Sequence, residues 1–300
     1  MAGFSATDAA LTGFRIVWQR PKVLAVWAPV QFCLSLALTL FVATSAGPAF
    51  PQTMSLLLQL NPNPERVATL AREMAPTAIV LFSYVLITAA VINGAMNRAV
   101  FTPDDDRFGY LRLSTDELLQ LALLAILGVA FYLAIVLTLA VVAAIAGFGP
   151  IGAFVALLAL PAAIGGLIFL AVRLSLAPAL TFSSRQIRIT ESWRLTSGHF
   201  WPLLGAYFAA FALRFVVFGL TLAIAAAAAG IAAMAGGGPS GAHRNELLTV
   251  SEVLAPSGLI NLVISAFGQA LAWPILITPP AVICRALAGR GPGATGRAIA

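Results

Sequence analysis

Charged residues are scarce in this sequence. Lysine, arginine, aspartate and glutamate make up 9% of the chain, whereas a soluble domain carries about 25%. Hydrophobic residues make up 60%, and the mean hydropathy is +0.97. A chain of this composition lacks the polar surface that a folded domain needs in water, so we expect an integral membrane protein.

The side chains that most catalytic and metal sites need are also few. The chain has two histidines, His199 and His243, and two cysteines, Cys33 and Cys284. It has no phosphate-binding loop, no His-Glu-x-x-His pair and no glycine-flanked serine elbow. We therefore expect no enzyme activity, no metal site and no cofactor, and we interpret His199 as an interfacial residue rather than a base. We expect the cysteines to be small buried apolar residues without a disulfide.

Acidic residues are missing from the middle of every long apolar run. Carriers coupled to protons or ions usually hold carboxylates at the middle of the membrane. This absence argues against a coupled transporter, but not against one built on backbone carbonyl groups. The run Asp104, Asp105 and Asp106 lacks the alternating oxygen spacing of calcium loops, so we interpret it as a solvated loop.

Long apolar runs, by contrast, are plentiful, and they predict an all-α bundle of six transmembrane helices. The predicted spans are 23–46, 76–99, 116–146, 151–178, 200–235 and 256–284. We expect them to form a single membrane domain over 1–290, followed by a disordered tail over 291–300. The fifth span exceeds the roughly 20 residues that a bilayer needs. It must tilt, break near its alanine-rich end or extend outside the membrane.

Local patterns mark several helix ends. Pro64 predicts the start of a short helix before the second span. Ser114 followed by Glu117 three residues later is a capping-box pattern at the start of the third span. Residues 147–150 predict a tight turn, and Gly198 predicts a helix stop.

Residues 1–22 predict an amphipathic helix. Phe4, Leu11, Phe14 and Trp18 recur at spacings that place them on one face. Such a helix would lie in the membrane interface, with its rings at the depth of the lipid headgroups. The alternative is a cytoplasmic helix whose apolar face packs on protein.

The basic residues lie singly at the ends of the apolar runs. Thirteen of the seventeen fall in the N-terminal segment, in the connectors after the second and fourth spans, and in the C-terminal tail. Three fall in the other connectors, and Arg214 falls within a span. The positive-inside rule therefore predicts that both termini are cytoplasmic. The absence of a basic cluster argues against nucleic acid as a partner.

A short motif recurs before each odd-numbered span. The motif is an arginine between two apolar residues: Phe14-Arg15-Ile16, Leu111-Arg112-Leu113 and Trp193-Arg194-Leu195. The even-numbered spans end in Arg98, Arg173 and Arg285. These matches predict three copies of a unit that consists of an interfacial segment and a helical hairpin. The alternative is that every inward helix end needs an arginine beside an apolar residue.

Arg214 is the one charge that falls deep within a predicted span. A buried arginine in a membrane is rare and often functional, although a long side chain can also snorkel to the interface. Polar residues within spans either join helices by hydrogen bonds or line a polar pocket or pathway. Those in the second and sixth spans are Asn93, Asn97, Asn261, Ser265 and Gln269.

Tryptophan and arginine near the span ends are expected at the membrane–water interface, where amphipathic side chains gather. The predicted interfacial residues are Trp18, Arg112, Trp193, Arg194 and Trp201.

The run from Arg173 to Pro178, a short connector and then the stretch from Glu191 to Trp201 resemble a group of bacterial six-span proteins. These are the YciC-like proteins and the membrane domain that is fused to some glycerophosphodiester phosphodiesterases. The likeness is concentrated in 173–205, with a weaker echo at 98–121. The hydrolytic domain of the fused members has no counterpart in this sequence, so no catalytic residue carries over. The resemblance implies a membrane helper or a lipid-related role in the bacterial inner membrane.

Three functional hypotheses follow from these observations. The first is a non-enzymatic scaffold, partner subunit or lipid-interacting module in envelope homeostasis, with membrane lipids and other membrane proteins as partners. The second is a channel or permease for a small or anionic solute, lined by Arg214 and the polar residues of the second and sixth spans. A third, an intramembrane enzyme that acts on lipid, lacks candidate catalytic residues.

Overall fold

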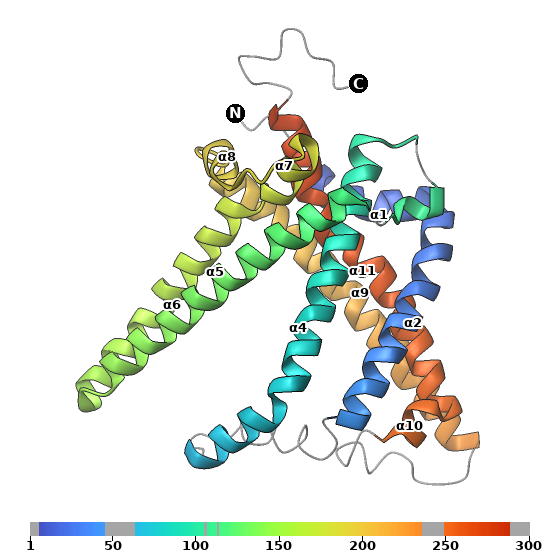
Figure 1. Cartoon of the computed structure of the whole chain (residues 1–300), viewed down its shortest axis with the longest axis horizontal. Coiled ribbons are helices and arrows are strands. Elements are labelled where there is room, and N and C mark those ends of the chain that lie inside the picture. The colour runs from blue at the N-terminus through green and yellow to red at the C-terminus, as the bar shows by residue number, and fades with distance from the viewer. Residues whose placement is uncertain (1–5, 46–63, 105–106, 113, 236–248, 289–300) are drawn as a thin grey trace. The chain divides into compact units, whose positions relative to one another are not determined.

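The structure, a computed structural model, describes residues 6–45, 64–104, 107–112, 114–235 and 249–288 (Figure 1). All regular elements in these residues are helical, which confirms the all-α prediction. Six helical segments are long and apolar enough to cross a membrane, as predicted: Pro21–Ser45, Arg72–Phe101, Arg107–Ala146, Gly149–Ser184, Phe200–Ile231 and Pro256–Leu287.

Most of the long helices, α4 excepted, begin and end close to the predicted bounds of the spans. The elements are α1 (Ala6–Gln19), α2 (Pro21–Ser45), α4 (Pro64–Phe101), η1 (Arg107–Tyr110), α5 (Thr115–Ala146), α6 (Gly149–Leu174), α7 (Ala177–Ser184), α8 (Ile189–Leu195), α9 (Phe200–Ala235), α10 (Val250–Leu254) and α11 (Pro256–Ala288). The predicted tail over 291–300 lies outside the described residues.

The prediction of a separate short helix before the second span is wrong. α4 begins at Pro64, as predicted, but it continues through Pro76 to Phe101 without a break. Figure 1 shows this helix bent in its N-terminal part. A proline inside a helix usually bends it, because its missing N–H leaves one carbonyl unpaired. An apolar chain keeps the helix regardless, since a break would leave more backbone groups without partners.

The predicted fourth span, 151–178, corresponds to two helices rather than one, within the candidate span Gly149–Ser184. α6 ends at Leu174, and a second short helix, α7, begins at Ala177 with Pro178 in its first turn. The ring of a proline clashes with the carbonyl group four residues earlier, which here belongs to Leu174. Proline in the first turn is well tolerated, so the same residue ends α6 and opens α7.

Three local predictions are confirmed. Ser114 and Glu117 form a capping box at the start of α5. Gly149 adopts a φ of +81° in the turn between α5 and α6, and Gly198 adopts +82° after α8, a backbone region that favours glycine.

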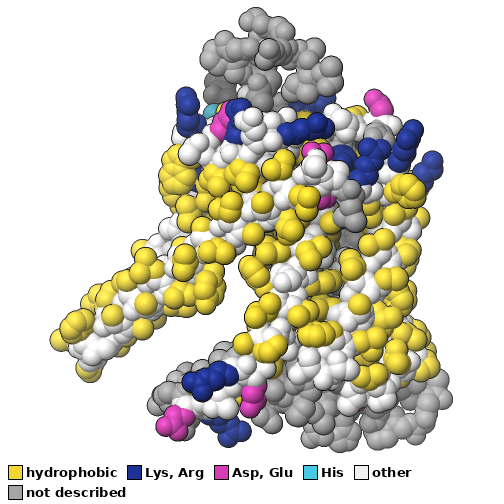
Figure 2. Space-filling view, viewed as in Figure 1, with side chains coloured by type: hydrophobic (Ala, Val, Ile, Leu, Met, Phe, Trp, Pro, Cys, Tyr) yellow, Lys and Arg dark blue, Asp and Glu magenta, His cyan; other side chains and the backbone are white. Residues whose placement is uncertain are grey.

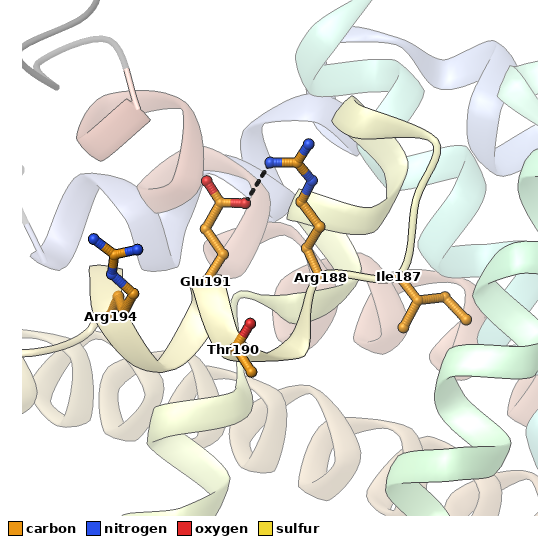
Figure 3. A pocket seen from close by; sticks show the side chains of 5 residues that line it. All are labelled: Ile187, Arg188, Thr190, Glu191 and Arg194. Atoms are coloured by element: carbon orange, nitrogen blue, oxygen red, sulfur yellow. Dashed lines mark hydrogen bonds and ion pairs between the residues drawn. The ribbon is translucent and has the colours of Figure 1, made fainter.

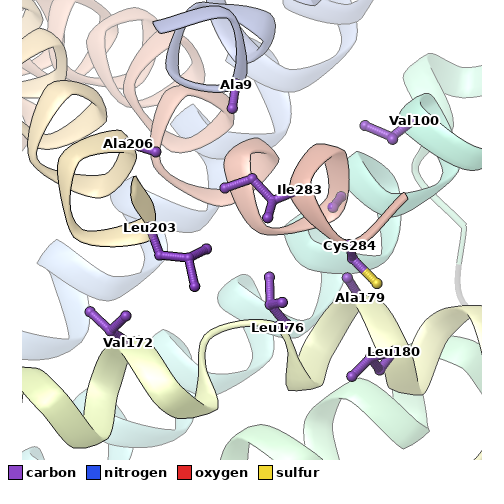
Figure 4. Close-up of a cluster of buried hydrophobic side chains, with 11 residues drawn as sticks. Ala9, Val100, Val172, Leu176, Ala179, Leu180, Leu203, Ala206, Ile283 and Cys284 are labelled. Atoms are coloured by element: carbon purple, nitrogen blue, oxygen red, sulfur yellow. The ribbon is translucent and has the colours of Figure 1, made fainter. Parts of the chain in front are cut away.

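The chain divides into two compact units, each built from segments far apart in the sequence. The first unit comprises 1–16, 89–212 and 274–300, and the second comprises 17–88 and 213–273. The hydrophobic core of the first unit joins α1, α4, α6, α7, α9 and α11 (Figure 4). Its fully buried side chains include Leu176, Leu203 and Ile283. This one cluster therefore joins α1 to five other helices of the unit.

The α5–α6 hairpin belongs entirely to the first unit. Its two helices pack against each other, and α5 also packs against α7. Large apolar side chains remain exposed along both helices, among them Leu133, Leu137 and Leu157 (Figure 2). Exposed surface of this kind is unfavourable in water and suits a lipid environment.

α1 buries one face, which carries Ala9, Ala10, Gly13 and Val17. Ala9 and Ala10 are buried, and a methyl group on Gly13 would clash with the backbone of Pro274. Leu11 and Phe14 lie on the other face and are 43% and 38% exposed. Leu11 and Phe14 are therefore not fully buried within the chain, Phe4 lies outside the described residues, and the interfacial position of α1 stays a prediction.

Candidate functional site

Arg98, in the last turn of α4, is the centre of a buried ion-pair network in the first unit. Its guanidinium pairs with the Glu117 carboxylate and donates to the Tyr110 carbonyl oxygen (3.0 Å) and the Ser114 hydroxyl (3.1 Å). The side chains of Arg98 and Glu117 are only 7% and 5% exposed. Glu117 also accepts a hydrogen bond from the Ser114 backbone N–H at 2.9 Å. The capping-box carboxylate is thus also the counter-ion that neutralises the buried arginine.

Two further contacts fasten the start of α5 to α7 and the turn that follows it. The Arg185 Nε lies 3.5 Å from the Asp116 carboxylate. The Gln120 amide donates to the Pro178 carbonyl oxygen at 2.7 Å. The ends of α4, α5 and α7 are therefore joined by charged and polar side chains as well as by the apolar core.

Arg173, in the last turn of α6, has different surroundings. Its guanidinium carbon lies 4.9 Å from the centroid of the Phe169 ring and 5.4 Å from that of Trp193. Its Nη1 donates to the Ser197 hydroxyl at 3.0 Å, whereas its Nε is buried without a hydrogen-bond partner. Cation–π contacts stabilise a guanidinium without neutralising its charge.

The backbone of Arg173 holds α8 in place. Its carbonyl oxygen accepts hydrogen bonds from the Ser192 hydroxyl (2.8 Å) and the Thr196 hydroxyl (3.3 Å). Both hydroxyls belong to buried residues, so α8 is fixed against the end of α6 with Trp193 against the guanidinium.

The three arginines that end even-numbered spans make comparable contacts. Like Arg98 and Arg173, Arg285 donates to a neighbouring segment, in its case to the Val100 carbonyl oxygen at 2.6 Å. Only Arg98 of the three has an ion pair with a carboxylate among the residues that the structure describes. In the described part of the chain, Arg173 and Arg285 thus have no carboxylate counter-ion at the ends of their two apolar helices.

A shallow pocket of about 330 Å³ lies over α8 and the turn before it (Figure 3). Ile187, Arg188, Thr190, Glu191 and Arg194 line it. The Glu191 carboxylate accepts a hydrogen bond from Arg188 at 2.9 Å, so the lining keeps one net positive charge from Arg194. An exposed ion pair of this kind contributes little to stability.

The predicted interfacial residues are exposed. Trp18 and Trp201 are the most exposed tryptophans, at 79% and 76%, and Trp193 is 41% exposed. Arg112 and Arg194 are exposed as well. This exposure agrees with an interfacial position, which stays a prediction.

In the second unit, Gln31 of α2 is the centre of a polar cluster. Its amide nitrogen lies 2.9 Å from the Gln269 side-chain oxygen, 3.0 Å from the Tyr84 hydroxyl and 3.5 Å from the Ser35 hydroxyl. The cluster joins α2, α4 and α11 within three candidate spans. Gln269 therefore bonds between helices, the structural role that polar residues in spans usually have.

Arg214 of α9 lies over the Trp273 ring, with the guanidinium carbon 5.1 Å from the centroid. The side chain is half-buried, and no carboxylate pairs with it in the described part of the chain. At 1.5 Å per residue, Arg214 lies about 21 Å along α9 from Phe200. It is thus well within the candidate span Phe200–Ile231.

The other predicted pocket residues lie apart in the chain's two units. The Asn93 amide donates to the Ala89 carbonyl oxygen at 2.8 Å, and Asn97 is buried. Both belong to the first unit, whereas Arg214, Asn261 and Gln269 belong to the second. Asn261 is exposed. A shared polar pocket stays a prediction.

The remaining candidate residues are the histidines, the aspartates of 104–106 and the cysteines, and those that the structure describes form no reactive cluster. The His199 ring lies 3.2 Å from the Ser197 carbonyl oxygen, and Asp104 is exposed. Asp105, Asp106 and His243 lie outside the described residues. Both cysteines are free, as predicted; Cys284 is buried, but Cys33 is exposed, so the expectation that both are buried is wrong for Cys33.

No group of three or more histidine, cysteine, aspartate or glutamate side chains that could hold a metal ion occurs within the described ranges. Comparisons with protein-family models, with curated proteins and with solved structures found no match to this chain. The resemblance to bacterial six-span proteins therefore stays a prediction.

Sequence reasoning missed the partners of two of these clusters. Glu117 was visible as a capping residue, but its pairing with Arg98 joins residues 19 positions apart. Gln31 is a lone amide in an apolar run, four residues before Ser35, and that isolation was the available signal. A polar side chain in such a run needs a hydrogen-bond partner on another helix.

Proposed function

We propose that the chain is a non-enzymatic multi-pass protein of a bacterial inner membrane that interacts with lipid at its cytoplasmic side. It would act as a scaffold or partner subunit in envelope homeostasis, as its resemblance to the YciC-like proteins implies. Both termini would be cytoplasmic, and membrane lipids and other membrane proteins would be its partners.

The main observation that supports this proposal is the packing of α1. The helix buries Ala9, Ala10 and Gly13 and leaves Leu11 and Trp18 exposed. A helix that is fixed to protein by one face and turns side chains such as Leu11 and Trp18 outward suits the boundary between headgroups and acyl chains.

The distribution of charge supports the same reading. The first unit carries nine described basic residues, Arg15, Arg98, Arg107, Arg112, Arg173, Arg185, Arg188, Arg194 and Arg285. The predicted threefold repeat would explain why the arginines that end α4, α6 and α11 make comparable contacts. Basic residues near an anionic membrane surface each contribute about 1 kcal/mol to binding.

Lipid-dependent stability tests the proposal. Purified protein in nanodiscs that contain phosphatidylglycerol should unfold at a higher temperature than in nanodiscs of phosphatidylcholine alone, because its exposed arginines attract anionic headgroups. The double substitution Leu11→Ser and Trp18→Ser should remove part of that gain. A midpoint that does not depend on lipid composition would contradict the proposed function.

A second candidate function is a channel or permease for a small or anionic solute. The observation that favours it is Arg214, a cation within a candidate span that lies over Trp273 and has no carboxylate partner among the described residues. Proteoliposomes loaded with an anion-sensitive dye separate the two functions. Anion flux that Arg214→Ala abolishes would establish transport, whereas flux equal to that of empty liposomes would exclude it for the anion tested.

A further inference from the structure

We propose that Arg173 and Ser197 form a binding site for the phosphate group of a phospholipid headgroup. The proposal rests on the lipid-interacting function above and names the ligand of one site within it. The site lies where the apolar helix α6 ends and α8 begins.

The charge of Arg173 has no counter-ion among the residues that the structure describes. No ion pair joins it to a carboxylate in the described ranges, and its Nη1 donates to a neutral hydroxyl, that of Ser197. Its Nε is buried without a hydrogen-bond partner. An unpaired buried N–H on a charged group is costly, so this edge of the guanidinium favours an anionic ligand.

The Arg98 site shows what the Arg173 site lacks. Both arginines end an apolar helix and donate to a serine hydroxyl, at 3.1 Å in Ser114 and 3.0 Å in Ser197. Arg98 also has the Glu117 carboxylate, three residues after its serine. Three residues after Ser197 the chain has Phe200, so no carboxylate follows in the same place.

The free edge of the guanidinium has the shape that phosphate requires. Nε and Nη2 of an arginine present two parallel N–H groups, which bind two phosphate oxygens at once. In Arg173 the third nitrogen, Nη1, is taken by Ser197, which leaves that edge for a ligand. Trp193 lies over the guanidinium and is 41% exposed, so the site reaches the surface of the chain at this ring.

The surroundings point to a phosphate that is attached to lipid. Phe169, Trp193 and Phe200 form an aromatic cluster, with ring centroids 5.9 Å and 5.3 Å from that of Phe169. Aromatic side chains next to arginine at the end of an apolar span are typical of the depth at which headgroups lie. A soluble anion would find the same guanidinium but would gain nothing from the apolar wall.

A substituted counter-ion tests the site without removing its arginine. Ser197→Asp places a carboxylate next to Arg173, as Glu117 is placed next to Arg98. We expect the variant to fold with a thermal midpoint, in lipid-free detergent, at or above that of the unchanged protein. We expect its apparent affinity for phosphatidylglycerol, titrated and followed by native mass spectrometry, to fall at least about tenfold, or about 1.4 kcal/mol.

Two further variants complete the design. Ser183→Asp adds the same charge to an exposed position on α7 and should change the affinity less than about twofold. Arg173→Lys keeps the positive charge but loses the two parallel N–H groups of the guanidinium. It should therefore also weaken lipid binding while the protein stays folded. It carries the test if Ser197→Asp fails to fold.

The outcomes separate this site from the wider proposal. If Ser197→Asp and Ser183→Asp bind phosphatidylglycerol equally well, the Arg173 site is wrong, although lipid-dependent stability can still hold. If inorganic phosphate competes with phosphatidylglycerol at equal concentration, the site recognises soluble phosphate and the lipid assignment is overturned. If the unchanged protein shows no dependence on lipid composition, the proposed function itself fails.

Discussion

Arg98, at the end of α4, pairs closely with Glu117 and more distantly with Asp116, whose carboxylate lies 3.9 Å away. Glu117 pairs with Arg98, and both side chains are almost completely buried. Removal of one partner of a buried pair leaves an uncompensated charge, which costs about 3–5 kcal/mol. The ion pair between Arg15 and Asp8 is a contrast, because its side chains are 54% and 69% exposed.

We therefore expect Glu117→Ala to lower the free energy of unfolding by about 3–5 kcal/mol. Asp8→Ala, which removes the exposed ion pair, should cost about 0–1 kcal/mol. Denaturation in mixed micelles, followed by circular dichroism, measures both. Equal effects of the two substitutions would show that Arg98 finds another partner when Glu117 is removed.

At the scale of residues, the sequence was enough to identify notable side chains but not the residues that they contact. The spacing of Ser114 and Glu117 was enough to predict the capping box, because a helix N-terminus depends on neighbouring residues. The ion pair with Arg98, the stacking of Arg173 on Trp193 and the bonds of Gln31 to Tyr84 and Gln269 all depend on tertiary packing. Such contacts bring together residues that no local pattern relates.

At the scale of elements, close packing fixes α1 to the first unit. Gly13 lies so near the Pro274 carbonyl oxygen and the Ile275 Cα that a methyl group could not fit without a backbone shift. Gly165 of α6 has open space around it. The two glycines therefore form a matched pair, since both lie within helices and differ in what surrounds them.

We expect Gly13→Ala to destabilise the docking of α1 by about 1–3 kcal/mol, because overpacking forces the backbone to move. Gly165→Ala should be neutral or slightly stabilising, since alanine favours helix and meets no neighbour. Hydrogen exchange of residues 6–19 in detergent measures the effect. Unchanged protection of α1 in Gly13→Ala would mean that the helix is held by contacts other than this close approach.

The ends of helices could be predicted where one local residue decides them. They could not be predicted where two local rules compete. The bounds of α9 agree with the prediction, and Gly198 marks the stop after α8. Pro76 and Pro178 had opposite outcomes: the first lies inside a continuous helix, whereas the second separates two helices. Sequence alone does not distinguish these cases, because the outcome depends on whether neighbouring residues can satisfy the freed backbone groups.

At the scale of the molecule, composition was sufficient to predict the class of fold. Six apolar runs became six candidate spans, since the length and hydropathy of a run hardly depend on tertiary contacts. The division into two units was not visible in the sequence, because each unit combines segments far apart in the chain. Orientation is a different kind of prediction, since it depends on the distribution of charge alone.

Cysteine labelling tests the orientation. In a chain that carries Cys33→Ala and Cys284→Ala, a single cysteine replaces either Ser183 of α7 or Ser251 of α10, which are both exposed. The excess of arginine in the segments on the side of Ser183 predicts that this side is cytoplasmic. A membrane-impermeant maleimide should therefore label Ser251→Cys in cells with an intact inner membrane and label Ser183→Cys only after that membrane is opened. The reverse pattern would overturn the arginine count, and with it the placement of α1, α8 and the Arg173 site at the anionic surface of the cytoplasmic leaflet.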